Sequence, residues 1–367
     1  MRLTIVGPAY PLRGGIAHHV HAVHRDLVAR GHELQVVSFK KLYPRLLFPG
    51  TTELDFSRLT LDVGAVPILT PMNPLSWIRA SKAIREFAPD AVVIEWWNAS
   101  FGPGLGWIAR RLRATGIRSI ADCHNIISHE PTPFDRALIA YAFKPMHSFI
   151  THSENDRSRL LSVVPDVTAR VARLGEISEF YADSGAPRTG RTILFFGLVR
   201  EYKGLDVLIK ALAKVLERVD CHLLIAGEFY EPVEKYRRLI NELGIENAVT
   251  IDNRYVPNEE VHELFAKGDV LVMPYLRATQ SGIAQIALKN GIPIIASRSG
   301  GLAEVVQDNV NGLLFPTGDV DALSNRLLEY FEGGLGPILA GKIRSGSDSA
   351  QRSPIMAEVI EELAALR

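Results

Sequence analysis

The sequence has few cysteines, no net charge and no long apolar run. Its 367 residues include two cysteines, too few for a disulfide framework or a cysteine-based zinc site. Lys and Arg number 41, as do Asp and Glu, so the basic excess of a general nucleic-acid binder is missing. No run reaches the roughly 18 apolar residues of a spanning helix, and the N-terminus turns at Pro8 before a signal-peptide core is complete. We expect a cytoplasmic protein, or one at the cytosolic face of the inner membrane, with no nucleic-acid partner.

Short apolar runs alternate with longer amphipathic stretches along the chain. The runs are nearly continuous in apolar residues, as in strands buried on both faces of a parallel sheet. They span 3–6, 33–38, 91–95, 118–122, 148–152, 192–196, 222–226, 249–251, 270–273, 292–296 and 312–315. Helical patterns span 16–30, 73–87, 104–115, 206–217, 233–243 and 258–267. This alternation predicts an α/β fold with right-handed crossovers.

The strand and helix series starts twice, at Leu3 and at Thr192, with a turn-rich stretch at 182–190 between the two starts. We therefore predict two Rossmann-like domains, 1–185 and 190–340. A tail rich in Gly and Ser spans 332–354. The C-terminal segment 353–367 then contains a last helix at about 355–366, which we expect to pack back on the first domain. Ligands of open parallel sheets lie beyond the carboxyl ends of the strands, so we expect the site there, in a cleft between facing domains.

Glycines and basic residues follow the first strand of each half. Gly14 and Gly15 open a helix, where backbone amides can approach an anion, although a plain tight turn is the alternative. Gly197 follows the strand 192–196, and Arg200 and Lys203 lie three residues apart on the turn beyond it. A guanidinium and an ammonium placed there can bind a diphosphate. Two solvated charges are the alternative.

Hydroxyl and amide groups gather after the strand 270–273. The next helix is predicted to start near Ser281, where free amides together with Thr279, Gln280 and Ser281 suit sugar hydroxyls and phosphate oxygens. A simple helix cap by Thr279 or Ser281 is the alternative. Glu304 lies in a helix that opens at a Gly-Gly turn, and it is expected either to bind a ribose or to form a structural pair.

Taken together, these motifs resemble the GT-B glycosyltransferases of the large retaining family 4, also called glycosyl transferases group 1. Over residues 1–330 the matching segments follow the family's order and spacing: 14–15, 31–34, 196–206, 223–228, 269–274, 291–297 and 300–304. The resemblance implies a GT-B fold with an N-terminal acceptor domain and a C-terminal donor domain. It also implies that the enzyme moves a hexose from a UDP- or GDP-linked sugar to an acceptor hydroxyl with retention.

The resemblance also assigns roles to individual residues. Arg200 and Lys203 correspond to the basic pair that neutralises the leaving nucleoside diphosphate, and His124 corresponds to the family's histidine near the donor sugar. These three are the expected catalytic residues. The expected donor-binding residues are Gly14, Gly15, Gly197, Thr279, Gln280, Ser281, Gly282, Gln285 and Glu304.

The sequence departs from the family at one motif, which usually has two Glu residues separated by seven residues. Ala278 and Ile286 stand at the positions of these two Glu residues. The segment 279–282 resembles a sub-branch in which Gln280 and Ser281 line the sugar site, with Gln285 expected to hydrogen-bond nearby, at the ribose. In the mechanism proposed for such enzymes the leaving phosphate accepts the acceptor's proton, so no dedicated base is required.

No metal and no cofactor besides the nucleotide sugar are expected. Asp319 and Asp321 open a helix and are interpreted as caps. The histidines at 18, 19, 21 and 24 lack further ligands at zinc spacing.

Three residues are expected on the acceptor side. His19 lies on the first helix, Glu95 ends the strand 91–95, and Trp97 or Trp96 can stack on a sugar ring. One core tryptophan and a helix-capping Asn98 are the alternative for this segment.

The first half is slightly basic, with 21 Lys and Arg against 17 Asp and Glu in residues 1–185. Segments 40–48 and 107–113 mix basic, aromatic and apolar residues, as surfaces on anionic lipid do. They favour peripheral membrane contact and a sugar or lipid-linked acceptor, in surface polysaccharide or glycolipid synthesis. An acceptor-binding loop and a solvated helix are the alternative.

Two other classes of function suit paired Rossmann-like domains, namely another enzyme of the same fold and a binding protein. A nucleotide-sugar epimerase needs carboxylate and histidine acid–base groups, which look sparse here, and a pyridoxal-dependent phosphorylase needs a lysine Schiff base and a longer chain. A hinged two-domain sugar-binding protein is the non-enzymatic alternative, but paired cations suit a phosphate better than a free sugar. Stabilisation by one nucleoside diphosphate would favour the transferase.

Overall fold

The structure, a computed structural model, describes residues 1–43, 50, 52–127, 132–175, 180, 190–279, 281–346 and 354–366. The chain forms two compact units. The first comprises Met1–Phe56, Thr60–Ile177 and Ser353–Arg367, and the second comprises Ser57–Leu59 and Ser178–Arg352. The segment expected to link the domains, 182–190, lies outside the described residues except for Gly190.

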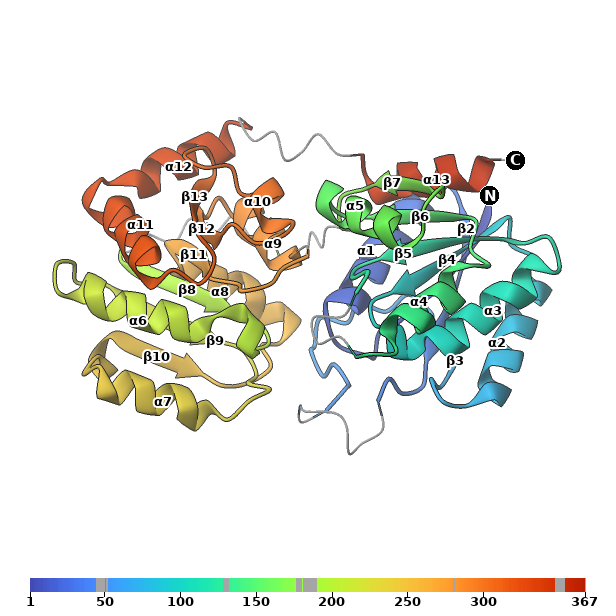
Figure 1. The fold of residues 1–367 in the computed structure, drawn as a ribbon, viewed down its shortest axis with the longest axis horizontal. Coiled ribbons are helices and arrows are strands. Elements are labelled where there is room, and N and C mark those ends of the chain that lie inside the picture. Colours follow the sequence, from blue (N-terminus) through green and yellow to red (C-terminus); the bar gives the residue numbers. More distant parts are fainter. Residues whose placement is uncertain are drawn as a thin grey trace. The chain divides into compact units, whose positions relative to one another are not determined.

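Seven parallel strands form the sheet of the first unit, in the order β3-β2-β1-β4-β5-β6-β7 (Figure 1). They are β1 (Arg2–Val6), β2 (Glu33–Phe39), β3 (Val66–Leu69), β4 (Ala91–Trp96), β5 (Arg118–Cys123), β6 (Ser148–Thr151) and β7 (Thr168–Val171). The strand order reverses at β1, which lies between β2 and β4. Ligands of doubly wound sheets bind at the carboxyl edge near such a reversal.

Helices cover both faces of this sheet. They are α1 (Gly15–Ala29), α2 (Pro74–Phe87), α3 (Gly102–Arg113), α4 (Asp135–Phe143), α5 (Glu154–Val163) and α13 (Met356–Ala365). Alternate strand residues point to opposite faces. Val92 and Ile94 of β4 join the core with α2, α3 and α4, whereas Ala91 and Val93 join the core with α1 and α13.

Six parallel strands form the sheet of the second unit, in the order β10-β9-β8-β11-β12-β13. They are β8 (Thr192–Phe196), β9 (His222–Ala226), β10 (Val249–Asp252), β11 (Val270–Met273), β12 (Ile294–Ser297) and β13 (Gly312–Phe315). Its helices are α6 (Leu205–Leu216), α7 (Val233–Glu242), α8 (Val261–Lys267), α9 (Gly282–Lys289), α10 (Leu302–Val305), α11 (Val320–Glu332) and α12 (Leu335–Arg344), with a 3-10 turn, η3 (Glu201–Lys203). The predicted α/β fold and all predicted strands are confirmed.

The sequence did not predict one of the helices. The stretch 332–354, described from the sequence as a tail rich in Gly and Ser, contains α12. Leu339 of this helix joins the second unit's core and Ala340 is also buried, so packing outweighs the glycine content of the segment. The last helix, α13, buries Met356, Ile360 and Leu363 against the first unit.

Cys123 and Cys221 are free and buried. Among the helices of the described segments, none is long and apolar enough to cross a membrane.

Candidate active site

The second unit presents two basic side chains just beyond β8. Gly197 leaves the strand with φ 102°, a backbone conformation that favours glycine. Val199 then pairs with the chain after β9, through its amide to the Glu228 carbonyl at 2.9 Å. This pairing holds Arg200 at the start of η3 and Lys203 at its end. The turn predicted from the sequence therefore lies at the carboxyl edge of the sheet.

Lys203 is buried, and its Nζ lies 5.4 Å from the centre of the Tyr275 ring. Burial, with the neighbouring charge of Arg200, lowers the pKa of Lys203 to about 7. Both influences act against the charged form. The Arg200 guanidinium lies over the Tyr230 ring, 4.8 Å from its centre. Two cations held together at a strand end, one of them dehydrated, form a place where a diphosphate would gain charge-assisted hydrogen bonds.

Other expected donor residues of the second unit lie around α9. Ser281 stands at the N-cap position of α9, with no cap hydrogen bond from its side chain. Thr279 and Ser281 are buried, whereas Gly282 is exposed and Gln285 is half-buried. Gln280 lies outside the described residues. Glu304 is exposed in α10.

The first unit gathers five ionisable side chains at the carboxyl edge of its sheet. Glu95 follows Ala91 and Val93 on the α1 face of β4, Asp122 follows Ile120 on β5, and His152 follows Ile150 just beyond β6. Glu95 and Asp122 are register partners across β4 and β5. Because strand residues two apart share a face, the same alternation that builds the core brings these polar groups together under α1.

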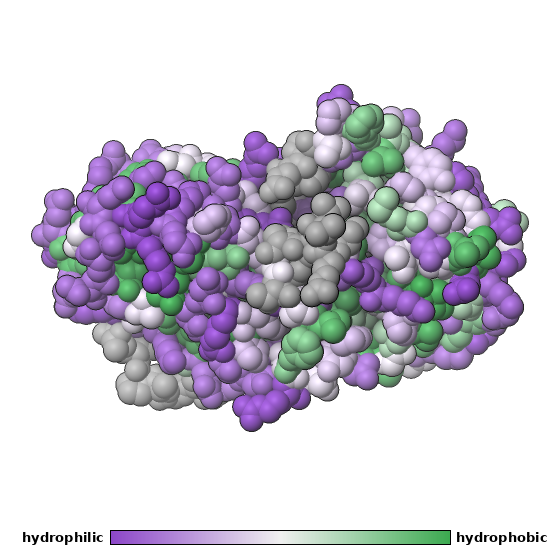
Figure 2. Space-filling model, turned by 90° about the horizontal axis from the view of Figure 1, so that it is seen from below, coloured by the Kyte–Doolittle hydropathy of each residue, from purple (hydrophilic) through white to green (hydrophobic). Residues whose placement is uncertain are grey.

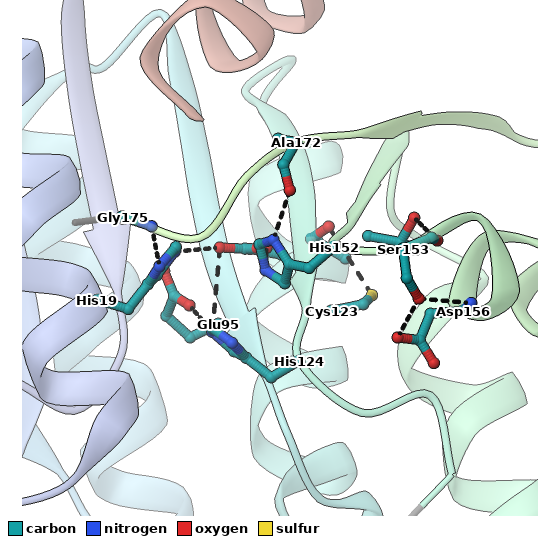
Figure 3. A network of polar contacts seen from close by, with 12 residues as sticks. His19, Glu95, Cys123, His124, His152, Ser153, Asp156, Ala172 and Gly175 are labelled. Atoms are coloured by element: carbon teal, nitrogen blue, oxygen red, sulfur yellow. Dashed lines mark hydrogen bonds and ion pairs between the residues drawn. The ribbon is translucent and has the colours of Figure 1, made fainter. Parts of the chain in front are cut away.

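Short contacts join this cluster, which is drawn in Figure 3. His19 Nε2 of α1 lies 2.8 Å from Asp122 Oδ2, and His152 Nε2 lies 2.9 Å from Asp122 Oδ1. His124 Nε2 lies 2.6 Å from Glu95 Oε2. Glu95 and Asp122 are fully buried, and His19 and His152 nearly so, while the His124 side chain is 11% exposed.

Burial and neighbouring charges shift the pKa values of the side chains in this cluster. Burial alone would raise the pKa of Asp122, but His152 and His19 hold it well below its usual value. Asp122 in turn raises the pKa of His152 despite its burial. Burial, reinforced by the Asp122 charge, holds the pKa of Glu95 well above its ordinary value. Burial also lowers the pKa of His19 and, more strongly, that of His124. These shifts favour the ionised form of Asp122, the protonated form of His152 and the neutral form of Glu95.

The cluster contains groups that could ligate a metal. One ligand atom each from His19, Asp122, His124 and His152 lies within 4.8 Å of the others. A ligating histidine normally donates its second ring N–H to an acceptor, as His152 Nδ1 does to the Ala172 carbonyl at 3.0 Å. His19 does not, since its Nδ1 accepts from the Gly175 amide at 3.0 Å and its Nε2 must carry the hydrogen. The donor set therefore fits a hydrogen-bond network better than a metal.

All three acceptor-side assignments need correction. Trp97 is 8% exposed and packs in the core against Phe101 and Phe39, with ring centres 4.3 and 5.8 Å away. Neither it nor the fully buried Trp96 is free to stack on a sugar, and Asn98 caps a short 3-10 helix, which is the alternative given by the sequence. His19 and Glu95 are also buried, so they act on a ligand only through other side chains.

Two members of the cluster were not singled out from the sequence. Asp122 and His152 lie at the carboxyl ends of two predicted strands, each two residues after a buried isoleucine, and this position is the signal that could have found them. Gly14, at the N-cap of α1 with φ 120°, and the exposed Gly15 lie where the sequence predicted them, at the turn after β1.

Two family models match the chain. Glycosyltransferase Family 4 matches residues 13–173, and Glycosyl transferases group 1 matches residues 190–332. The chain is 25% identical over 344 residues to an uncharacterized glycosyltransferase of Methanocaldococcus jannaschii, covering 85% of this chain and 84% of the relative. It is 26% identical over 352 residues to a GDP-mannose-dependent alpha-(1-6)-phosphatidylinositol monomannoside mannosyltransferase of Mycolicibacterium smegmatis, covering 88% and 87%.

Solved structures show the same fold. Anabaena HepE in complex with UDP has a TM-score of 0.75 at 16% identity, with both chains fully covered. Sucrose-phosphate synthase from Thermosynechococcus elongatus has a TM-score of 0.74 at 17% identity, covering 99% of this chain and 96% of that one. The fold is thus GT-B. The chain belongs to the family 4, or group 1, glycosyltransferases and is an enzyme that transfers a sugar from a nucleotide sugar.

Proposed function

We propose that this glycosyltransferase is a retaining, metal-independent hexosyltransferase that uses a UDP- or GDP-linked sugar. The observation that carries the proposal is the pair of cations beyond β8, Arg200 and the buried Lys203. Negative charge grows on the diphosphate as the sugar departs, so preorganised cations stabilise the transition state more than the ground state. His124 binds a donor sugar oxygen, and Gly14, Gly15, Thr279, Gln280, Ser281, Gly282, Gln285 and Glu304 complete the donor site. The leaving phosphate accepts the acceptor's proton.

The first test is a panel of donors. Thermal unfolding is followed with UDP, GDP and ADP, and hydrolysis is followed with the corresponding hexose nucleotides, with and without EDTA. Stabilisation by UDP or GDP and EDTA-resistant hydrolysis that first releases the sugar with its original anomeric configuration support the proposal. Stabilisation by none of the three nucleotides, loss of hydrolysis in EDTA or an inverted product contradicts it.

The buried cluster of histidines and carboxylates also supplies the acid–base groups that a nucleotide-sugar epimerase requires. Incubation of each donor without an acceptor separates the two reactions. A transferase releases free sugar and nucleoside diphosphate, whereas an epimerase returns a nucleotide sugar with one inverted carbon.

We also propose a peripheral membrane contact at the cytosolic face, with a lipid-linked or sugar acceptor, in surface polysaccharide or glycolipid synthesis. Support comes from α2 and the residues before it, where Met72, Leu75 and Ile78 are 82%, 62% and 51% exposed beside exposed Arg79 and Lys82. Apolar residues beside cations suit an anionic lipid surface. Figure 2 shows hydrophobic residues reaching the surface in separate patches among hydrophilic ones.

The sequence predicted membrane contact through two other segments, 40–48 and 107–113. Residues 44–49 lie outside the described residues. In α3, Arg110 lies over the Tyr141 ring at 3.7 Å and donates to backbone carbonyls, and Trp107 packs against Trp77. Sedimentation with anionic vesicles at low salt tests the contact. We expect Leu75→Glu to reduce the bound fraction, and equal binding of neutral and anionic vesicles would contradict an electrostatic contact.

A further inference from the structure

We propose that Asp122 is a positioning residue that acts through Glu95 to fix His124 in the tautomer with its hydrogen on Nδ1. The ring then offers a donor, not an acceptor, to a hydroxyl or ring oxygen of a sugar. The use of this donor rests on the proposed function, whereas the tautomer is a property of the free protein.

The backbone fixes the tautomers of two histidines in the cluster, His152 and His19. His152 Nδ1 lies 3.0 Å from the Ala172 carbonyl oxygen, which can only accept, so Nδ1 carries a hydrogen. His19 Nδ1 lies 3.0 Å from the Gly175 amide, which can only donate, so this nitrogen carries none. The hydrogen of the neutral His19 ring is therefore on Nε2, which faces Asp122.

Asp122 is approached by a histidine at each oxygen. His19 Nε2 donates to Oδ2 at 2.8 Å, and His152 Nε2 forms an ion pair with Oδ1 at 2.9 Å without hydrogen-bond geometry. A hydrogen bond from a donor and a nearby positive charge both favour the ionised form of a carboxyl group. The buried negative charge is compensated by His152, the one histidine of the cluster whose pKa is raised.

The surroundings of Glu95 favour its neutral, protonated form. It is the cross-strand partner of Asp122, on the same face of the sheet and fully buried. Two buried carboxyl groups in such proximity do not both ionise, and Asp122 has both the hydrogen bond from His19 and the ion pair with His152. Gly7 leaves the room that the Glu95 side chain fills, since a Cβ there would lie 2.3 Å from Glu95 Cγ. Glu95 is therefore the member of the pair that keeps its proton.

The proton on Glu95 decides the state of His124. Glu95 Oε2 lies 2.6 Å from His124 Nε2, whereas Glu95 Oε1 is buried and makes no hydrogen bond within the described residues. The acid hydrogen therefore belongs on Oε2, where it donates to Nε2. Nε2 must then accept, so the single hydrogen of the neutral ring lies on Nδ1. The His124 side chain is 11% exposed, which leaves part of the ring accessible to a ligand. A sugar oxygen has the lone pair that such a donor requires.

Nuclear magnetic resonance of protein labelled with ¹⁵N-histidine tests the tautomer directly. The His124 signals, identified by their loss in H124Q, should show Nδ1 in the protonated range and Nε2 in the unprotonated range at neutral pH. The reverse assignment in the wild-type protein, or a doubly protonated ring, overturns the inference without any variant.

Variants then test the role of Asp122. In D122N the negative charge beside Glu95 is gone, so the pKa of Glu95 should fall although its burial remains, and the His124 hydrogen should shift toward Nε2. In E95Q the amide still donates to Nε2, so the Nδ1–H tautomer should persist, and in E95Q/D122N it should return. D156N is the matched control, because Asp156 is a buried carboxyl near His152 but is not a register partner of Glu95. It should leave the tautomer unchanged.

Catalysis gives a second readout. With the best donor of the panel, D122N should lower kcat for hydrolysis by roughly 10- to 100-fold, the usual range for a residue that orients another. E95Q/D122N should recover part of that loss. An unchanged tautomer in folded D122N, or no recovery in the double variant, contradicts the role of Asp122. If the tautomer is as expected but no donor is turned over, the proposed function fails and the structural inference stands.

Discussion

The backbone amide of Gly175 donates to Nδ1 of His19, 3.0 Å away. This bond ties the chain that follows β7 to α1, directly above the Asp122 cluster. The approach is close, because a Cβ at Gly175 would lie 2.8 Å from Ala22 Cβ and 3.2 Å from the His19 carbonyl oxygen. Only glycine fits this position without movement of α1 or of the segment itself.

We predict that Gly175→Ala destabilises the protein by about 1–3 kcal/mol, the usual cost of overpacking. The midpoint of chemical unfolding measures this. Gly341→Ala is the control, since a Cβ at this position in α12 meets no atom within 4 Å and alanine favours a helix. Equal stability of Gly175→Ala and the wild-type protein would show that the segment is not packed as described.

The docking of α13 should depend on pH. Glu361 accepts from Arg30 Nε and Nη2, each at 2.8 Å, and contacts His32 Nε2 at 2.7 Å. Hydrogen bonds from Arg30 and then His32 lower the pKa of Glu361 to about 2. A carboxyl group whose pKa is lower in the folded than in the unfolded state stabilises the folded protein at pH values above the unfolded pKa. This contribution is lost as the pH falls toward about 2. Glu361→Gln should therefore cost roughly 1 kcal/mol near neutral pH and progressively less in acid.

Glu362→Gln provides the comparison on the same helix. Glu362 pairs with Arg170 at 2.8 Å, but both side chains are nearly half exposed, so the pair is screened by solvent. We expect its thermal unfolding to match that of the wild-type protein at each pH. A larger loss for Glu362→Gln than for Glu361→Gln would contradict the assigned role of Glu361.

Much of the fold was predictable because the strands of a buried parallel sheet are apolar runs. The strands that escaped prediction, Val66–Leu69 and Thr168–Val171, are the two edges of the first sheet. Each has only one neighbour and carries exposed positions, so the continuous apolar signal is weak there. The helix Leu335–Arg344 escaped because glycine content reports local propensity and not the core that the helix covers.

The candidate site was predictable only in part. Arg200 and Lys203 are close in sequence, so one turn reveals both. His19, Glu95, Asp122 and His152 come from four separate elements, and their proximity depends on strand register and on the position of α1. The spacing of the histidines within residues 18–24 gave no sign of this cluster, because its other members are more than 70 residues away.

The lowered pKa of Lys203 should couple diphosphate binding to proton uptake. The pKa is about 7 in the free protein, because of burial and Arg200. A bound diphosphate favours the ammonium and raises this pKa, so above pH 7 each binding event takes up a proton. Affinity for UDP, or for GDP if that is the nucleotide that binds, should fall as pH rises from 7 to about 9, by up to about tenfold per unit.

Calorimetry in two buffers of different ionisation enthalpy measures that uptake. Lys203→Arg is the matched control, since a guanidinium stays charged throughout this range and should remove most of the pH dependence. A wild-type affinity that is constant from pH 7 to about 9 would contradict the buried, weakly basic state of Lys203.

Removal of either cation should impair catalysis. We expect Arg200→Ala and Lys203→Ala each to lower donor hydrolysis tenfold or more, with circular dichroism unchanged, because both stabilise the charge of the departing diphosphate. Arg200→Ala should also raise the pKa of Lys203, since it removes a neighbouring positive charge. Wild-type turnover in either variant would exclude that residue from the donor site.

A substitution at Gly197 tests the position of the Lys203 ammonium without removing its charge. A Cβ at Gly197 would lie 3.0 Å from Lys203 Nζ and 2.7 Å from Ile283 Cδ1, in a backbone with φ 102°. Gly197→Ala should therefore displace the ammonium and weaken nucleoside diphosphate binding, in addition to a backbone cost of roughly 1–2 kcal/mol. Gly190→Ala has a similar backbone cost, with φ 76°, but its Cβ meets no atom within 4 Å. Both variants should lose stability, but only Gly197→Ala should lose affinity for the nucleoside diphosphate, as measured by isothermal titration. That result would show that binding of the diphosphate depends on the position of the ammonium. Equal affinities of the two variants would mean that Gly197 is required only for folding.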